Sequence, residues 1–411
     1  MAAIMNMLLG NHANVFSDPI VGGSIDVTLV PGVTSTTNVT NNTMEHSINN
    51  DKFFIAFFGS GGALTARSLQ INSNNSISIS GNTIINANDC DSPTSIYVPN
   101  TGSIYVAYRD DAAGENILVR RVTMNANNTI TLNGQVTVEN GNLDDPHIAY
   151  DSTADRLLVQ YEEDDGTSPI RSRVLNTTPA TTSGLYDQPG GSGSTLAANL
   201  YNPAADRVYT LWYQNPNWYK HATNVAASSA TFGSSVVYAN YNDPYVAWSN
   251  HERSLYSPKE GAVYFFGYSY LNPNYVQRYH VLTGTGPSIS SMQTVPLSSP
   301  DAGFELDPGV DMFYIDHSQR IGFVYHEKNL SNNQYKVKVA EFSTSGNSLT
   351  LECTTIIDSG TFINQITRPF IVQAQYSTVS KKVLIWTYDP SNPVADTSMS
   401  RFRVYIPAGG A

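Results

Sequence analysis

The sequence repeats itself, and this repeat restricts the possible folds more than any other feature of the chain. One pattern, an apolar run ending in an aromatic residue, a tight polar turn and a second β-rich run, recurs at intervals of 51 to 62 residues. Its anchor residues are His46, Tyr97, Tyr150, Tyr201, Tyr256, Tyr314 and Tyr376. The first copy is degenerate. Recurrence at this spacing is typical of proteins in which each repeat forms one supersecondary unit.

Each copy is expected to form a β-hairpin followed by two further strands. The turns contain Asn-Thr-Gly, Thr-Ala-Asp or Ala-Ala-Asp, which tolerate the backbone angles of tight turns. Residues 117–122 and 135–138 illustrate the later strands, and no stretch shows a capped helical periodicity. Four strands in about 50 residues form a propeller blade. The chain is therefore predicted to be an all-β, seven-bladed β-propeller of four-stranded antiparallel blades.

The two ends of the repeat region predict how the ring closes. The last copy stops after residues 400–406, one strand short of a blade, and residues 24–30 offer a β-rich run upstream of the first copy. Pairing the two would remove two open sheet edges. The propeller is predicted at residues 24–411, with 24–30 as the closing strand and blades that start near residues 44, 92, 144, 194, 243, 300 and 359. A β-sandwich, a solenoid, and propellers of six or eight blades remain alternatives.

The charge balance argues against two classes of partner. The formal net charge is −12 and only 14% of the residues are charged, so neither nucleic acid binding nor membrane insertion is predicted. Asn, Ser, Thr and 25 Tyr carry the polar share, which suits short polar turns in an external environment. Cys90 and Cys353 form no zinc motif, and free thiols are expected.

Residues 1–23 are predicted to form an N-terminal docking arm. The first ten residues are apolar but lack the basic start of a secretory signal, and they are too few to span a bilayer. An arm folded against its own domain and an unusual signal peptide are the alternatives. Because an apolar terminus is usually disordered unless something holds it, we favour docking on a partner subunit.

Acidic loops are expected on one face of the propeller. Asp144, Asp145 and Asp243 precede prolines at predicted entries to inner strands, and they are candidate binding residues. Asp before Pro commonly caps a turn. The functional alternative is a ring of carboxylates at the channel mouth that binds Ca²⁺ or hydrolyses glycosides. No ligand spacing indicates calcium, so no cofactor is predicted.

Aromatic residues complete the predicted binding face. Trp218 and Tyr219 follow one Pro-Asn turn, and Tyr270 and Tyr275 flank another. Such rings can stack on sugars when exposed, whereas burial within a strand is the alternative. The sequence contains no nucleophile elbow, no histidine pair at metal-ligand spacing and no phosphate-binding glycine loop. No catalytic or metal-binding residue is predicted.

Two hairpins carry a resemblance to a known group of proteins. Tyr-Asp-Ser-Thr-Ala-Asp-Arg-Leu at 150–157 and Tyr-Asn-Pro-Ala-Ala-Asp-Arg-Val at 201–208 resemble repeats in virion proteins of tailed bacteriophages, where propeller modules occur in tail fibres, nozzles and surface appendages. The resemblance extends over residues 44–406. It implies a non-enzymatic virion surface or tail protein whose arm binds another virion protein. The propeller face would contact a neighbouring subunit, a host glycan or a host receptor.

Two other functions stay open at this point. A secreted carbohydrate-active enzyme would carry its carboxylates at the channel mouth and have a cleavable N-terminus. A secreted lectin-like module would bind sugars without turnover and would not need the arm.

Overall fold

The structure is a computed structural model, and the residues it describes fold almost entirely into β-strands. Besides the strands, the described residues contain two single-turn 3-10 helices, η1 (Ser60–Gly62) and η2 (Asp111–Ala113). The described residues are 18–29, 42–163, 170–178, 182–187, 194–214, 217–226, 229–232, 236–240, 253–271, 274–283, 293–329, 331–361, 371–388 and 399–410.

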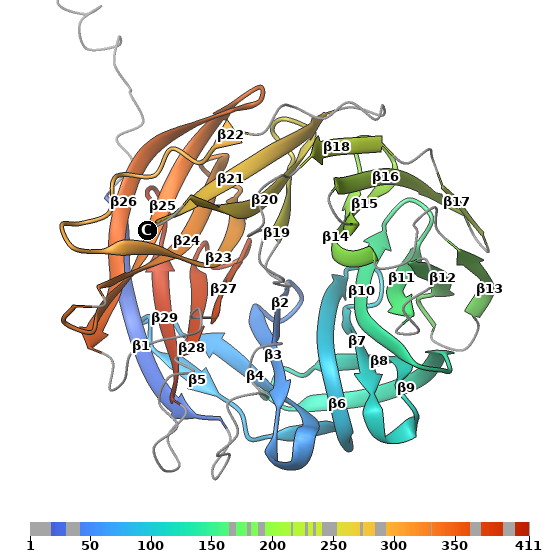
Figure 1. Ribbon diagram of the computed structural model, residues 1–411. Helices are drawn as coiled ribbons and strands as arrows, with labels where there is room; N and C mark the ends of the chain where they lie inside the picture. The colour runs from blue at the N-terminus through green and yellow to red at the C-terminus, as the bar shows by residue number, and fades with distance from the viewer. Residues whose placement is uncertain are drawn as a thin grey trace, which may run out of the picture.

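The strands form antiparallel sheets that lie around a common centre (Figure 1). The strands nearest this centre are β2 (Thr43–Ser47), β6 (Thr83–Val98), β10 (Leu143–Asp151), β14 (Ser194–Asn202), β19 (Arg253–Ser257), β23 (Glu305–Ile315) and β27 (Ile371–Tyr376). Their hairpin partners are β3 (Lys52–Phe58), β7 (Ser103–Asp110), β11 (Arg156–Glu163), β15 (Arg207–Gln214), β20 (Ala262–Leu271), β24 (Arg320–Asn329) and β28 (Val383–Tyr388).

Further strands extend each sheet outwards. The third strands are β4 (Ala63–Ile71), β8 (Asn116–Met124), β12 (Arg171–Asn176), β16 (Asn217–Val225), β21 (Asn274–Thr283), β25 (Gln334–Ser345) and β29 (Met399–Ile406). The outer strands are β1 (Ile20–Thr28), β5 (Ile77–Ile79), β9 (Ile130–Glu139), β13 (Thr182–Asp187), β17 (Ala230–Phe232), β18 (Val236–Asn240), β22 (Gln293–Thr294) and β26 (Ser348–Thr361).

Strand β6 belongs to two sheets. Its first half pairs with β4 as an outer strand, and its second half pairs with β7 as an inner strand. These two sheets are therefore hydrogen-bonded into one of eight strands. The chain passes from the outside of one sheet to the centre of the next without an intervening loop.

The second strand of each hairpin is buried on both faces, because each sheet packs between two others. In β3, Phe53, Ile55 and Phe57 pack against side chains of β28 and β29. The alternate residues, such as Phe54 and Phe58, pack against β6, β7 and β8. A strand covered on both faces needs a continuous apolar run. This requirement explains the sequence Phe-Phe-Ile-Ala-Phe-Phe at 53–58.

The N-terminal strand β1 is the outer strand of the last sheet. It pairs antiparallel with β29, and the sheet order is β1-β29-β28-β27. The pairing predicted from sequence is present, but the strand spans Ile20–Thr28 rather than 24–30. Its start therefore falls within the residues expected to form the arm. Ile25 and Val27 pack on the cluster shared by β28, β29 and the first sheet, and Asp26 lies 2.6 Å from Arg403.

The turn after each inner strand has the same backbone geometry in all repeats. The residue five positions after the anchor has positive φ every time: Asp51, Gly102, Asp155, Asp206, Gly261, Gln319 and Lys381. In three repeats this residue is an aspartate that binds the anchor side chain, for example Tyr150 Oη to Asp155 Oδ1 at 2.8 Å and Tyr201 Oη to Asp206 Oδ1 at 2.9 Å. This contact is the physical basis of the aromatic-to-aspartate spacing in the repeat.

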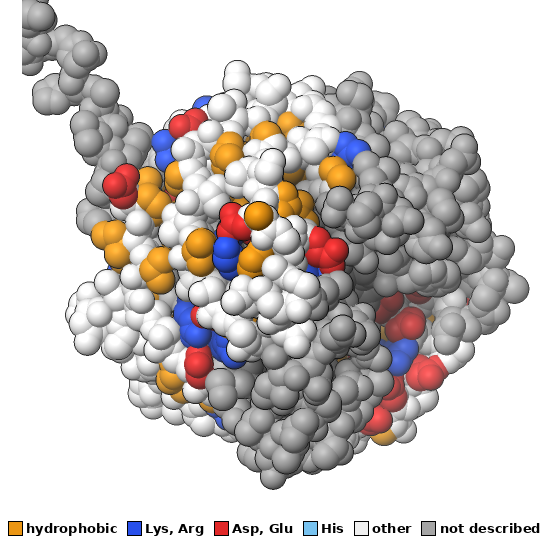
Figure 2. Space-filling model, turned by 60° about the vertical axis from the view of Figure 1, so that its left-hand side comes forward, with side chains coloured by type: hydrophobic (Ala, Val, Ile, Leu, Met, Phe, Trp, Pro, Cys, Tyr) orange, Lys and Arg blue, Asp and Glu red, His pale blue; other side chains and the backbone are white. Residues whose placement is uncertain are grey.

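The outer surface carries few charges. On the face turned forward in Figure 2, scattered hydrophobic side chains lie among uncharged polar groups, and charged side chains occur in small mixed groups. Ile20 and Val21 of β1 and Ile356 of β26 are among the exposed large hydrophobic residues of the described chain.

Candidate functional site

A cavity of about 750 Å³ is lined by residues of the innermost strands β2, β6, β10, β14, β19, β23 and β27. Its wall includes carboxylates, hydroxyls, amides and an imidazole, carried by Glu45, Ser95, His147, Asn199, Asp311 and Gln375. Because strands from all parts of the chain meet here, residues far apart in sequence can contact one ligand. This axial cavity is the first part of the candidate site.

Hydrogen bonds between neighbouring inner strands shape the cavity wall. The side chain three positions before the anchor provides them in four repeats. Thr43 Oγ1 lies 2.5 Å from Ser95 Oγ, and Thr94 Oγ1 donates to the Pro146 carbonyl at 2.9 Å. Asp311 accepts the Ala374 N–H at 2.7 Å, and Gln373 Nε2 donates to the Asn42 carbonyl. The inner strand of one sheet is thus fixed against the next.

Glu45 and Asp311 place two carboxylates in this wall. They lie on β2 and β23, and each of these strands packs against β27. Asp311 is oriented by the backbone, because its Oδ1 accepts the Met312 N–H and its Oδ2 accepts the Ala374 N–H. Burial and the charge of Asp311 raise the pKa of Glu45 to about 8. The Glu45 carboxyl is therefore mostly protonated at neutral pH.

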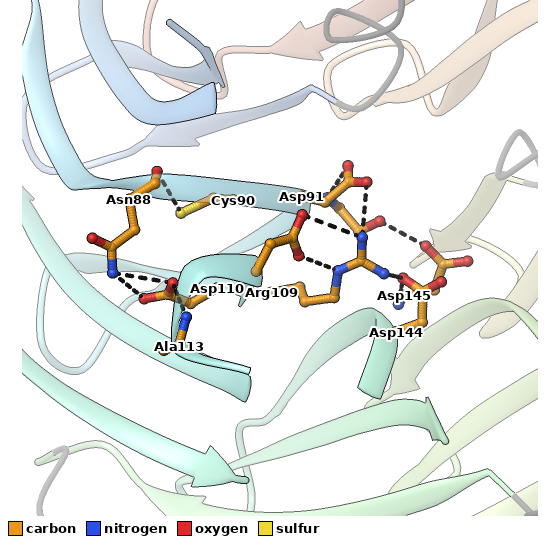
Figure 3. A network of polar contacts seen from close by, with 10 residues as sticks. Asn88, Cys90, Asp91, Arg109, Asp110, Ala113, Asp144 and Asp145 are labelled. Atoms are coloured by element: carbon orange, nitrogen blue, oxygen red, sulfur yellow. Dashed lines mark hydrogen bonds and ion pairs between the residues drawn. The ribbon is translucent and has the colours of Figure 1, made fainter. Parts of the chain in front are cut away.

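A polar network at the entry of two inner strands is the second part of the candidate site (Figure 3). Arg109, at the end of β7, lies 2.6 Å from Asp111, 2.5 Å from Asp144 and 3.3 Å from Asp91. Asp145 Oδ1 accepts the Ser92 hydroxyl at 2.7 Å. Figure 3 shows the guanidinium surrounded by the carboxylates of β6, η2 and β10.

The Asp-x-Pro segments build this network through equivalent β-bulges. The register of β6 shifts after Asp91, and that of β10 shifts after Asp144. Each aspartate accepts the N–H of the next residue, Ser92 or Asp145, at 2.7 and 2.9 Å. Both of those residues have positive φ. The aspartates therefore stabilise strained turns, which is the structural role considered for them from the sequence.

The charged groups of this network shift one another's pKa values. Burial and the charge of Asp145 raise the pKa of Asp144, against the lowering effect of Arg109. The Arg109 pKa is itself raised by its acidic neighbours, although burial opposes this shift. Arg109 therefore holds Asp144 in place, while the charge of Asp145 opposes the ionisation of Asp144.

The aromatic candidates lie on other sheets than the aspartates. Tyr219, on β16, is half-buried and stacks on Trp212 with ring centroids 5.5 Å apart. Part of its ring is therefore used in packing. Trp218 precedes Tyr219 in the same strand. The backbone of Trp218 therefore lies within a strand, as one of the two sequence-based alternatives expected. Tyr270 and Tyr275 are paired near the β20–β21 turn.

The structure does not bring all seven candidates together. Asp144 and Asp145 are neighbours in β10, and Tyr270 and Tyr275 are paired across β20 and β21, but these two pairs belong to different sheets. Asp243 lies outside the described residues. Both cysteines are free: Cys90 is buried and Cys353 half-buried, and burial raises the pKa of Cys90 to about 12 and that of Cys353 to about 11. Neither thiol is activated as a nucleophile at neutral pH.

Sequence reasoning missed Arg109, Glu45 and Asp311. Arg109 precedes Asp110 and Asp111, but only the fold brings it to Asp144. Glu45 stands one residue before its anchor, and Asp311 stands three residues before its anchor. The residue types at these two positions differ from repeat to repeat. Their period-two placement on inner strands was the signal that could have found them.

Across the described part of the chain, no group of three or more His, Cys, Asp and Glu side chains is arranged to hold a metal ion. The described residues also include no helix of the length and apolarity that a membrane span requires.

Comparison with known proteins informs the fold alone. No family model matches the sequence, and no curated protein does. A protein of known structure from Lactobacillus plantarum is similar with a TM-score of 0.50 at 12% identity, over 80% of this chain and 85% of that chain. A triple mutant of AofleA from Arthrobotrys oligospora gives 0.49 at 6% identity, over 84% and 93%. The Dos1 propeller gives 0.47 at 7% identity, over 94% of both chains.

The fold class follows from the arrangement of the sheets. Antiparallel sheets lie around a centre, and their innermost strands line a cavity, as in a β-propeller.

Proposed function

We propose that the architecture is a closed seven-bladed propeller. Each of the seven inner strands begins one unit of four or five strands, and buried clusters join every unit to its neighbours. The last interface unites Leu384 and Phe402 with Phe53 and Leu69, more than 300 residues away. Gln373 bonds Asn42 across the same interface. These contacts support closure between the first and last blades.

Within this architecture, we infer a non-enzymatic surface or tail protein of a phage virion, consistent with the resemblance of its hairpins. The observation that carries the proposal is the position of β1. This strand lies at the outer edge of the last sheet, so the chain before it starts from the periphery, away from the axial cavity. An arm that starts there can reach a neighbouring virion protein while the propeller face stays free for a host receptor or glycan.

The alternative of a carbohydrate-active enzyme is weakened by the contacts of its candidate carboxylates. Asp144 is held by Arg109 at 2.5 Å, and Asp145 is bound by Ser92. Both side chains therefore stabilise the bulge and the junction between two blades. Turnover of a bacterial surface polysaccharide that is lost in Asp144→Asn, with the fold retained, would overturn the non-enzymatic assignment.

The docking role is tested by the mass of the protein in solution. Light scattering would compare the full chain with a variant lacking residues 1–17, which keeps all of β1. We expect the full chain to self-associate through its apolar arm. The shortened chain should be a monomer with the same melting temperature.

Two stable monomers would remove the support for the arm as a docking element, and sugar-binding assays on the propeller face would then come first. A shortened chain that unfolds would show that residues 1–17 serve their own domain instead.

A further inference from the structure

The sequence contains two Asn-Gly pairs, Asn133-Gly134 and Asn140-Gly141. In such a pair the backbone nitrogen of the glycine can attack the side-chain amide carbon of the asparagine, because the glycine has no Cβ to hinder the approach. The attack closes a five-membered ring within one stretch of chain, so it needs no group from elsewhere in the fold. Whether a given pair reacts therefore depends on how its local backbone is held.

Asn140 and Gly141 lie in the short loop between β9 and β10, and both are exposed. Gly141 has a φ of 139°, and a Cβ added there would meet no atom within 4 Å. Exposed loops open locally more readily than paired strands do. The rotations that bring the glycine nitrogen to the asparagine side chain are therefore easier here than inside a sheet.

Asn133-Gly134 provides the contrast within the same chain. This pair lies inside β9, and β9 is paired with β8 on both sides of it. The Asn133 side chain is also occupied, because its Nδ2 donates to Thr123 Oγ1 at 2.9 Å. Both the backbone and the side chain would have to leave the sheet before the attack, so this pair should react far more slowly.

The Gly141 N–H is held by a neighbouring side chain. It donates to Asn116 Oδ1 at 3.0 Å. Asn116 is itself oriented, because its Nδ2 donates to the Ala113 carbonyl at 2.8 Å. The attack requires the Gly141 nitrogen to lose its proton and to turn towards Asn140, so this hydrogen bond must open first. Asn116 thus limits how often the loop can react.

We propose that Asn140 is a site of spontaneous deamidation and that Asn116 slows the reaction. The bond between Gly141 N and Asn140 Cγ forms and the Cγ–Nδ2 bond breaks. Nδ2 leaves as ammonia, which carries away the proton of the Gly141 N–H. Water then opens the cyclic imide and leaves either aspartate or isoaspartate at position 140. Water is the only co-reactant.

The product changes the chain close to the polar network of Arg109. Isoaspartate lengthens the main chain by one carbon at position 140. Leu143 follows shortly after; its side chain is buried and its N–H donates to the Glu115 carbonyl at 3.2 Å. The next residue is Asp144, which lies 2.5 Å from Arg109. The added length must be absorbed between positions 140 and 143, or it displaces Asp144 from Arg109.

The experiment incubates the full chain at mildly alkaline pH, both folded and in guanidinium chloride, and follows the two pairs by mass spectrometry with fragmentation. In the folded protein we expect conversion at Asn140 while Asn133 stays intact. In the denatured chain both should react at similar rates, because the fold no longer separates them. An intact Asn140 in the folded protein, or equal conversion at Asn133, would overturn the assignment.

Two variants of Asn116 test its role. Asn116→Ala removes the acceptor of the Gly141 N–H and should speed the conversion of Asn140 about two- to tenfold, the factor that corresponds to one hydrogen bond. Asn116→Asp keeps an acceptor oxygen and should react at nearly the wild-type rate. Hydrogen exchange of the Gly141 N–H should accelerate in Asn116→Ala alone, and melting temperatures check that both variants fold. Equal conversion rates in all three proteins would refute the role of Asn116.

Discussion

At the scale of single residues, the seven repeats share a backbone angle more closely than they share residue types. The position five after each anchor has positive φ, yet it holds Asp, Gly, Gln or Lys. Glycine adopts this conformation freely, and aspartate does so more readily than most residues. Gln319 and Lys381 hold it against their preference, because the hairpin geometry is set by the strands on either side. A search for identical residues therefore misses copies that the spacing reveals.

The pKa of Glu45 predicts how stability depends on pH. The folded value is raised from 4.5 to about 8, so the folded state holds a proton that the unfolded chain releases. Stability should therefore fall as pH rises from about 4.5 to about 8, by at most about 1.4 kcal/mol per pH unit. Glu45→Gln should lack this contribution. Urea unfolding at several pH values measures this contribution.

The comparison that matters is the difference between the two proteins, because other groups titrate equally in both. Parallel stability curves for the wild type and Glu45→Gln across this range would show that Glu45 is not held protonated by the fold.

At the scale of single elements, β1 shows why sequence reasoning found the strand but not its limits. Residues 24–30 have β-rich character, whereas Gly22 and Gly23 do not predict a strand. The structure extends β1 through them because they lie close to neighbouring chain. A Cβ at Gly23 would lie 2.1 Å from the Asn75 carbonyl oxygen, and one at Gly22 would lie 3.0 Å from Val404. Only tertiary contacts reveal that glycine is needed there.

This close approach predicts an asymmetric pair of glycine variants. Gly23→Ala should destabilise the protein by about 1–3 kcal/mol, because the methyl group meets backbone, and should speed hydrogen exchange in β1. Gly81→Ala, where no atom lies within 4 Å of the added Cβ, should change stability by less than about 0.5 kcal/mol. Chemical denaturation with exchange mass spectrometry checks both. Similar effects in the two variants would mean that β1 does not pack as closely as described.

At the scale of the whole molecule, sequence reasoning predicted the all-β class and the antiparallel sheets, because both follow from local patterns of turn and strand. The candidate site was harder to predict. Its cavity wall depends on contacts between strands such as β2 and β27, and the partners differ at each junction. Thr43 meets a hydroxyl, Asp311 meets an N–H and Gln373 meets a carbonyl. No single residue type marks such positions in the sequence.

The proposed closure predicts a sharp difference between two truncations. Removal of residues 1–28 deletes β1, exposes the edge of β29 and uncovers the cluster on which Ile25 and Val27 pack. It should cost at least about 3 kcal/mol and promote aggregation. Removal of residues 1–17 should leave the melting temperature unchanged. Thermal unfolding with size-exclusion chromatography measures both.

An unchanged melting temperature after loss of β1 would mean that the ring does not depend on its N-terminal strand.

The place of β1 in the covalent path has a mechanical consequence. The strand lies between the N-terminus and the other described strands, and it pairs with β29 between Ile20 and Thr28, with a register shift after Val21. If the arm is anchored to a particle, a pulling force on the propeller travels along β1 before it reaches β2. The hydrogen bonds to β29 then carry the load together, in shear, rather than opening one after another. A propeller anchored in this way would resist pulling through the hydrogen bonds between β1 and β29.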